Sequence, residues 1–246
     1  IVEMPPQYFG FVPFLPGSAH FHCIAGRLFF QSPFLLITGM LLSLMKREYV
    51  ARQNNQLKRR IKRAKFPMLK TFDEFHMEYL NHVTPAFLKE LANCDFVSKH
   101  QNVVMIGNPG TGKTHLMIAL GLKACACGFN VLFKTAADLA TDLCEARDEY
   151  RLQRLEKSIA QADLLLLDEL SYISFNQQKS ELLFKVISDR SERASTIIST
   201  NLDFSKWAEL FDNPTMVAAL VDRMTFHSYV LNMNGDSYRL NSRIKA

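Results

Sequence analysis

Residues 107–114 have the types and the spacing of a phosphate-binding loop. They read GNPGTGKT, which fills every fixed position of the motif G-x-x-x-x-G-K-[ST]. Glycines let such a loop turn its backbone N–H groups toward phosphate oxygens. A lysine at the seventh position reaches the β and γ phosphates, and the hydroxyl after it binds Mg²⁺. The sequence therefore predicts that a nucleoside triphosphate contacts Gly107, Asn108, Pro109, Gly110, Thr111, Gly112, Lys113 and Thr114.

Two adjacent carboxylates complete this chemistry. Asp168 and Glu169 directly follow four leucines, and such a run is typical of a strand that is buried on both faces. Ligands of α/β proteins bind at the carboxyl ends of such strands. We expect Asp168 to hold Mg²⁺ together with Thr114, and Glu169 to act as the general base on the attacking water. Asn201, after the β-branched run 195–200, either contacts the γ-phosphate or starts an ordinary turn.

Strands and helices must alternate to position these groups. The pattern predicts strands at 102–106, 130–134, 163–167, 195–199 and near 228–233. It predicts helices at 113–126, 136–147, 150–160, 177–192 and 214–224, with one more near 85–94. Alternation of this kind indicates an α/β fold, a P-loop NTPase whose parallel sheet is covered by helices.

Positive charge is concentrated in one segment. The net charge is +5, yet residues 46–65 alone hold nine Lys or Arg and one Glu. This segment has helical composition, and Phe66-Pro67 ends it. A charge run is often only a solvated face, but phosphates would relieve the repulsion between so many like charges. We expect binding to duplex DNA, largely independent of sequence, through Arg52, Lys58, Arg59, Arg60, Lys62, Arg63 and Lys65.

The first residues differ from the rest. The chain begins with Ile1, and prolines interrupt regular structure as far as Pro33, so 1–36 is expected to be an atypical extension, disordered or not native. Residues 28–45 carry no charge, which leaves a membrane span as an alternative. The uninterrupted apolar part, 34–45, is shorter than the ~20 residues that a span needs, which favours a buried or interfacial helix over a span and leaves contact with a membrane open. The five cysteines lack metal-ligand spacing, which favours a reducing cytoplasm.

Several of these stretches together resemble the IstB family, the ATP-binding helper proteins of insertion sequences, which are similar to the DnaC helicase loaders among the AAA+ ATPases. The resemblance covers about residues 40–246 and rests on GNPGTGKTHLMIALG, VLFKTAADLA, DLLLLDELSYI, ELLFKVISDRSERASTIISTN and GDSYRL. The basic stretch EYVARQNNQLKRRIKRAKFP resembles the N-terminal segment of the family.

The resemblance implies ATP and Mg²⁺ as ligands, ATP hydrolysis, and self-association on DNA that assists a partner transposase. Asn201 then corresponds to the sensor-1 residue, and Arg223 to the arginine finger that reaches the ATP of a neighbouring subunit. Alternatively, Arg223 is a surface arginine that pairs with Asp222 or with solvent. Arg239 is a candidate for a further phosphate sensor.

We expect a basic helical DNA-binding segment at 37–66 and an AAA+ core at 67–246 without a full lid domain. Two other functions stay open. The first is a DnaC-like loader of a replicative helicase, which would differ in its protein partner. The second is an inactive or membrane-tethered nucleotide-binding remnant.

Overall fold

The computed structural model describes residues 33–75, 83–170, 177–209, 211, 213–235 and 237–238. The chain divides into two units, residues 1–48 and residues 49–246. The described part of the first unit, 33–48, is entirely helical. The second unit contains the sheet and every predicted site residue.

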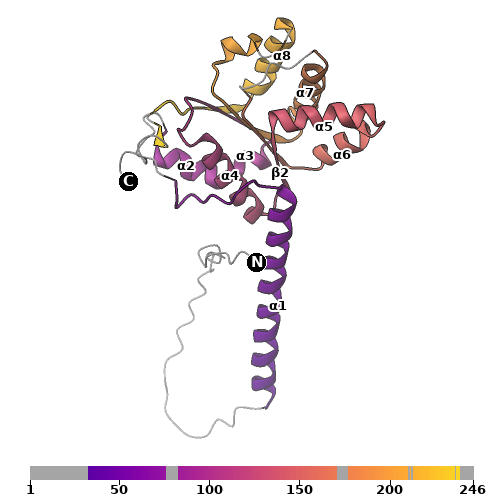
Figure 1. The fold of residues 1–246 in the computed structure, drawn as a ribbon. Helices are drawn as coiled ribbons and strands as arrows, with labels where there is room; N and C mark the ends of the chain where they lie inside the picture. The colour runs from indigo at the N-terminus through magenta and orange to yellow at the C-terminus, as the bar shows by residue number, and fades with distance from the viewer. Residues whose placement is uncertain are drawn as a thin grey trace. The chain divides into compact units, whose positions relative to one another are not determined.

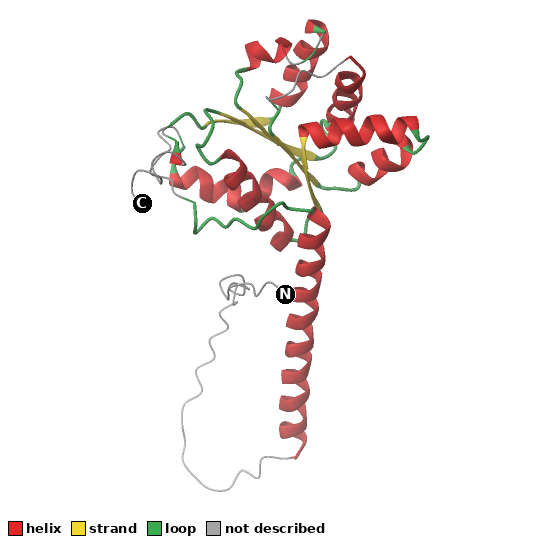
Figure 2. Ribbon diagram, viewed as in Figure 1, coloured by secondary structure: helices red, strands yellow, loops and turns green. Residues whose placement is uncertain are grey.

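Five parallel strands form one sheet in the order β2-β3-β4-β1-β5 (Figure 2). Their bounds are β1 (Asn102–Ile106), β2 (Val131–Thr135), β3 (Leu164–Asp168), β4 (Ser195–Thr200) and β5 (Ser228–Asn232). Every residue of β3 and β4 is buried, because these strands are covered on both faces. The leucine run therefore forms the strand that its composition predicts.

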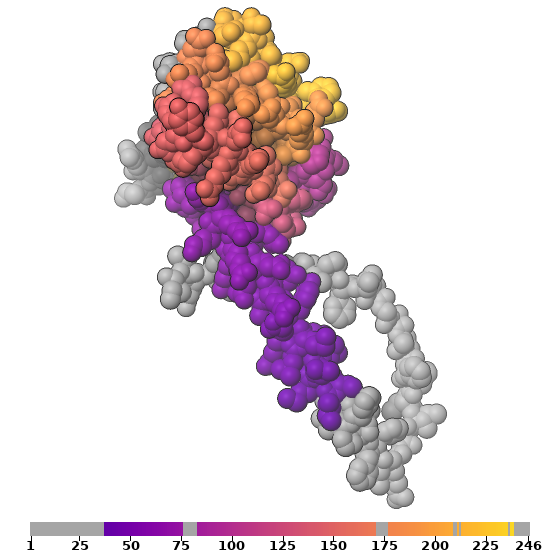
Figure 3. Space-filling view, turned by 90° about the vertical axis from the view of Figure 1, so that its right-hand side faces the viewer, coloured from indigo at the N-terminus to yellow at the C-terminus, as the bar shows by residue number. Residues whose placement is uncertain are grey.

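Helices cover the two faces of the sheet in two layers (Figure 1). On one side, α2 (Pro85–Ala92), α3 (Asp95–Ser98) and α4 (Lys113–Cys127) share an apolar core with β1, β2 and β3. On the other side, the core is formed by α5 (Ala136–Asp148), α6 (Leu152–Ala160), α7 (Gln177–Arg190), the 3-10 helix η3 (Phe204–Glu209) and α8 (Pro214–Thr225). Helices α5 and α6 pack together and form part of the outer surface of this layer (Figure 3).

The first helix, α1 (Pro33–Ala64), is longer than its basic part. The sequence predicts an interruption at Pro33, but proline fits the first turn of a helix, where no N–H bond is needed. Residues 37–51 are exposed, including several large apolar side chains. Near its end, Leu57, Ile61 and Ala64 pack against the core of the second unit. Among the residues that the structure describes, no helix is long and apolar enough to cross a membrane.

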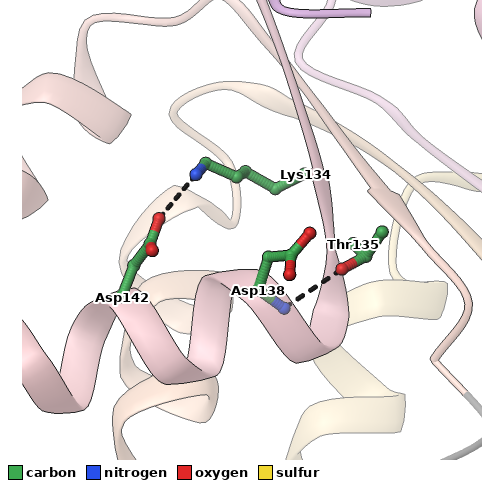
Figure 4. A network of polar contacts seen from close by, with 4 residues as sticks. All are labelled: Lys134, Thr135, Asp138 and Asp142. Carbon is green, nitrogen blue, oxygen red and sulfur yellow. Dashed lines mark hydrogen bonds and ion pairs between the residues drawn. The ribbon is translucent and has the colours of Figure 1, made fainter. Parts of the chain in front are cut away.

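The turn from β2 into α5 is held by two polar contacts (Figure 4). The Thr135 hydroxyl caps α5 by accepting the Asp138 N–H at 3.0 Å, and Lys134 Nζ contacts Asp142 Oδ2 at 2.5 Å. Thr135 also lies opposite Asp168 in the register between β2 and β3. A fixed start of α5 therefore supports the strand end at which the predicted carboxylates lie.

The parallel sheet with helices on both faces confirms the predicted fold class. All five predicted strands lie within about one residue of the observed bounds. The short elements α3 and η3 were not predicted. The expectation for residues 1–36 falls mainly on 1–32, which lie outside the described residues, as does Arg239.

Candidate nucleotide-binding site

The predicted phosphate loop connects β1 to the first residue of α4. Lys113 is buried, and its Nζ donates to the carbonyl oxygens of Gly107 and Asn108, at 2.7 Å each. The Thr111 hydroxyl donates to the Asn108 carbonyl at 2.9 Å. Gly112 precedes α4 and gives it no side-chain cap. The ammonium group and the first N–H groups of α4 thus form the electropositive surface that an anion requires.

Gly112 meets two separate constraints. Its φ of +90° lies in the left-handed region, which residues with a side chain rarely adopt. A Cβ at this position would also lie 2.9 Å from Cε2 of Phe75. The residue types of the motif therefore reflect both the turn of the loop and a ring packed closely against it.

Thr114 and Asp168, the two predicted metal ligands, are in contact. The Thr114 hydroxyl donates to Asp168 Oδ1 at 3.1 Å, across 54 residues of sequence. Hydroxyl and carboxylate oxygens are ligands that suit Mg²⁺, which usually keeps waters and substrate phosphates as its other ligands. The described residues contain no cluster of three or more His, Cys, Asp or Glu that could hold a metal. The donor set therefore fits Mg²⁺ bound together with a phosphate.

Glu169 follows β3 in an uncommon backbone conformation. Its φ is +60°, which costs a non-glycine residue of order 1–3 kcal/mol and is often found at functional sites. Its side chain is exposed and lines the same cavity as Lys113, Thr114 and Asn201. The structure thus brings together the residues that the sequence selected for phosphate, metal and water.

This cavity has a volume of about 400 Å³. Besides the phosphate loop, it is lined by apolar side chains, including Met68, Phe75 and Ile118. The Phe75 ring packs edge-on against His115, with 5.3 Å between the ring centroids, and His115 Nε2 lies 2.8 Å from the Thr71 carbonyl oxygen. Sequence analysis predicts no element between residues 66 and 84 and does not reveal this wall, because no local pattern reports its contact with the loop.

Residues after β5 cover the phosphate loop from another side. The Asn108 N–H donates to Asn234 Oδ1 at 3.1 Å, and the Tyr238 N–H donates to the Gly110 carbonyl at 3.1 Å. A Cβ on Gly107 would lie 2.5 Å from the carbonyl oxygen of Met233. Gly107 is therefore required by this close approach of two backbone segments.

Arg223 lies on α8 and is not among the residues that line the cavity. Its Nη1 donates to the Ser188 hydroxyl at 3.0 Å, and its guanidinium carbon lies 5.3 Å from the centre of the Phe184 ring. The side chain is exposed, so it can still reach a second molecule. Its proposed role as an arginine finger stays a prediction.

The seven basic residues predicted to bind DNA are not equivalent. Arg60 is half-buried, and its Nη1 donates to the Cys125 carbonyl at 3.3 Å, near the carboxyl end of α4. A cation at this position interacts favourably with the helix dipole. The other six are exposed: Arg52, Lys58, Arg59, Lys62, Arg63 and Lys65. Arg60 therefore has a structural contact that the sequence does not predict.

Solved structures with a similar fold belong to the AAA+ P-loop NTPases. The replication initiator DnaA bound to AMPPCP and single-stranded DNA matches with a TM-score of 0.57 and 21% identity, over 71% of this chain and 54% of that one. The DnaC helicase loader matches with a TM-score of 0.54 and 21% identity, over 68% of this chain and 96% of that one. These likenesses show that the core shares its fold with these two proteins.

Sequence comparison identifies the family. A protein of insertion sequence IS21 from Pseudomonas aeruginosa, named as an ATP-binding protein, is 37% identical over 82% of this chain and 76% of its own length. A counterpart of insertion sequence IS5376 from Geobacillus stearothermophilus is 33% identical over 82% of this chain and 81% of its own. The family model of the IstB-like ATP binding protein matches residues 35–246. Together with the phosphate loop and its paired carboxylates, these matches show that the chain belongs to the IstB-like family of insertion-sequence ATP-binding proteins.

Proposed function

We propose that this protein hydrolyses ATP while assembled as an oligomer on DNA, in the cytoplasm, and that it assists a transposase in selecting its target. The observation that carries the proposal is the convergence of Lys113, the Thr114–Asp168 pair and Glu169 on one cavity. Each of the three supplies a different requirement of phosphoryl transfer: a fixed cation, metal ligands and a base.

Each residue of the site would have a separate role in ATP hydrolysis. Lys113 would turn from the Gly107 and Asn108 carbonyls toward the β and γ phosphates, where one fixed cation offsets their charge. Thr114 and Asp168 would hold Mg²⁺, which supplies further neutralisation of the phosphate charge when it is bound. Glu169 would take the proton of the attacking water, and Asn201 would orient that water or the γ-phosphate. The apolar wall around Phe75 offers a surface for the base of the nucleotide.

The DNA and transposase parts of the proposal rest on charge and on family. Six exposed cations near the end of α1 provide a contact surface for phosphates. The relatives are named for insertion sequences, which favours a transposase as the partner. The DnaC likeness spans 96% of that loader and supports a helicase as the alternative partner. Co-purification with a transposase, or with a replicative helicase, separates these two functions.

ATP hydrolysis with and without duplex DNA tests the proposed activity. Glu169→Gln should bind ATP but turn it over at least ~100-fold more slowly, because the change keeps the shape and removes the base. Lys113→Ala should fail to bind ATP. A matched control is Glu145→Gln, the same change at an exposed residue of α5 outside the cavity, which should leave turnover unaltered. Normal turnover by Glu169→Gln, or tight ATP binding by Lys113→Ala, would refute the assignment.

A further inference from the structure

Ser199 contacts both predicted carboxylate residues of the site, the metal ligand Asp168 and the general base Glu169. It lies in β4, is 1% exposed, and stands beside the end of β3 in the parallel register, where Leu167 is paired with Ile198. Its hydroxyl donates to Asp168 Oδ1 and accepts the N–H of Glu169 at 2.9 Å. One buried oxygen atom therefore contacts both members of the acidic pair.

The backbone around Glu169 requires such support. Successive side chains of a strand point to opposite faces, and the left-handed turn at Glu169 ends this alternation. Glutamate rarely adopts that conformation unless its surroundings impose it. Three hydrogen bonds to β4 do so: Glu169 N–H to Ser199 Oγ, Leu170 N–H to the Ser199 carbonyl at 2.9 Å, and Thr200 Oγ1 to the Leu170 carbonyl at 3.1 Å.

The same hydroxyl also orients the metal-binding carboxylate. Asp168 Oδ1 accepts from Ser199 on one side and from Thr114 on the other. Two donors on one oxygen restrict the rotation of the carboxylate, so Asp168 is fixed before a nucleotide arrives. Loss of the Ser199 hydroxyl would remove one hydrogen bond from Asp168 and one from Glu169.

We infer that Ser199 is a positioning residue that sets the geometry of both carboxylates for ATP hydrolysis, an inference that rests on the proposed function. Ser199 acts through Asp168 and Glu169 and transfers no proton itself. Misplacement of a catalytic group by about 1 Å can cost ~100-fold in rate. Removal of the hydroxyl should therefore lower kcat more than it alters the affinity for ATP.

The chain offers a matched control in the same strand. Ser195 is also fully buried in β4, but its hydroxyl donates to the Phe96 carbonyl at 3.1 Å and does not line the cavity. Ser195→Ala and Ser199→Ala each remove one buried hydroxyl from β4, so a merely structural role predicts similar effects of the two changes. A positioning role of Ser199 predicts that Ser199→Ala lowers the turnover of ATP more than Ser195→Ala does.

Two measurements test the inference in the full chain. For Ser199→Ala we expect kcat at least ~10-fold lower with KM for ATP within about threefold of the parent, and for Ser195→Ala we expect kcat within about twofold. Without nucleotide, the Glu169 amide should exchange its hydrogen at least ~10-fold faster in Ser199→Ala only. Should Ser199→Ala not fold, Ser199→Cys against Ser195→Cys carries the same comparison, because a thiol is a near-isostere that bonds weakly.

The outcomes separate the two proposals. If the parent protein hydrolyses ATP and the two alanine variants have equal kcat, the inference about Ser199 is wrong while the proposed function stands. Unchanged exchange of the Glu169 amide in Ser199→Ala overturns the inference as well. A parent protein that hydrolyses no ATP, with or without DNA, refutes the proposed function and removes the role of Ser199 with it.

Discussion

The contact between Arg60 and Cys125 divides the basic segment into residues that can bind DNA and one that supports the core. We expect the triple variant Arg59→Gln, Lys62→Gln, Arg63→Gln to weaken the salt dependence of DNA binding, because these side chains are exposed. Each phosphate contact contributes about 0.9 to the slope of log affinity against log salt, so three contacts contribute about 2.7. Between 50 and 200 mM salt, the parent should therefore lose about 40-fold more affinity than the variant.

Fluorescence anisotropy of a labelled duplex, titrated at several salt concentrations, measures this slope. The matched control is Arg60→Gln, whose side chain donates to the Cys125 carbonyl. It should leave the slope nearly unchanged and lower Tm by roughly 2–4 °C, as expected for the loss of about 1 kcal/mol in a protein of this size. A triple variant with the slope of the parent would refute the assignment of the DNA contact. A large slope change in Arg60→Gln would refute the division within the segment.

Two further predictions concern the subunit contact and a buried thiol. Arg223→Ala should retain ATP affinity and lose turnover, and mixing it with Glu169→Gln should restore part of the turnover if Arg223 acts on the site of a neighbouring molecule. The control is Phe184→Leu, which removes only the ring under the Arg223 guanidinium. Turnover that is independent of protein concentration would speak against a shared site. Burial raises the pKa of the Cys125 thiol to about 12, so the unfolded chain loses this proton at lower pH than the folded chain. The free energy of unfolding should therefore fall by up to ~1.4 kcal/mol per pH unit between about pH 9 and 12. In urea unfolding, Cys125→Ala should show a shallower decline over that range, and identical pH slopes would contradict the burial of this thiol.

The parts of the fold that were predicted correctly depend on local pattern. The leucine run before Asp168, the glycine loop and the helix after Lys113 each carry their signal within a few residues, so their positions were close to those observed. The start of α1 at Pro33 is not predicted, because proline usually breaks a helix, although it is favourable in a first turn.

The contacts that the sequence did not reveal are non-local. Ser199 meets Asp168 and Glu169 only through the pairing of β3 with β4. Phe75 reaches Gly112 from a connector without any motif, and Arg60 reaches Cys125 across 65 residues. A residue type can indicate the chemistry of a position, but strand order and register decide which residues support it.

The strand order has a consequence for the synthesis of the protein. Among the described strands, β1, which leads into the phosphate loop, pairs with β4 and β5, the two that are made last. Asn108 and its partner Asn234 are 126 residues apart. At 5–20 residues per second, a ribosome needs about 6 to 25 s to add that length. A nascent chain therefore carries its basic helix for many seconds before its phosphate loop can take its final form. During translation, the cations of that helix precede a complete nucleotide site.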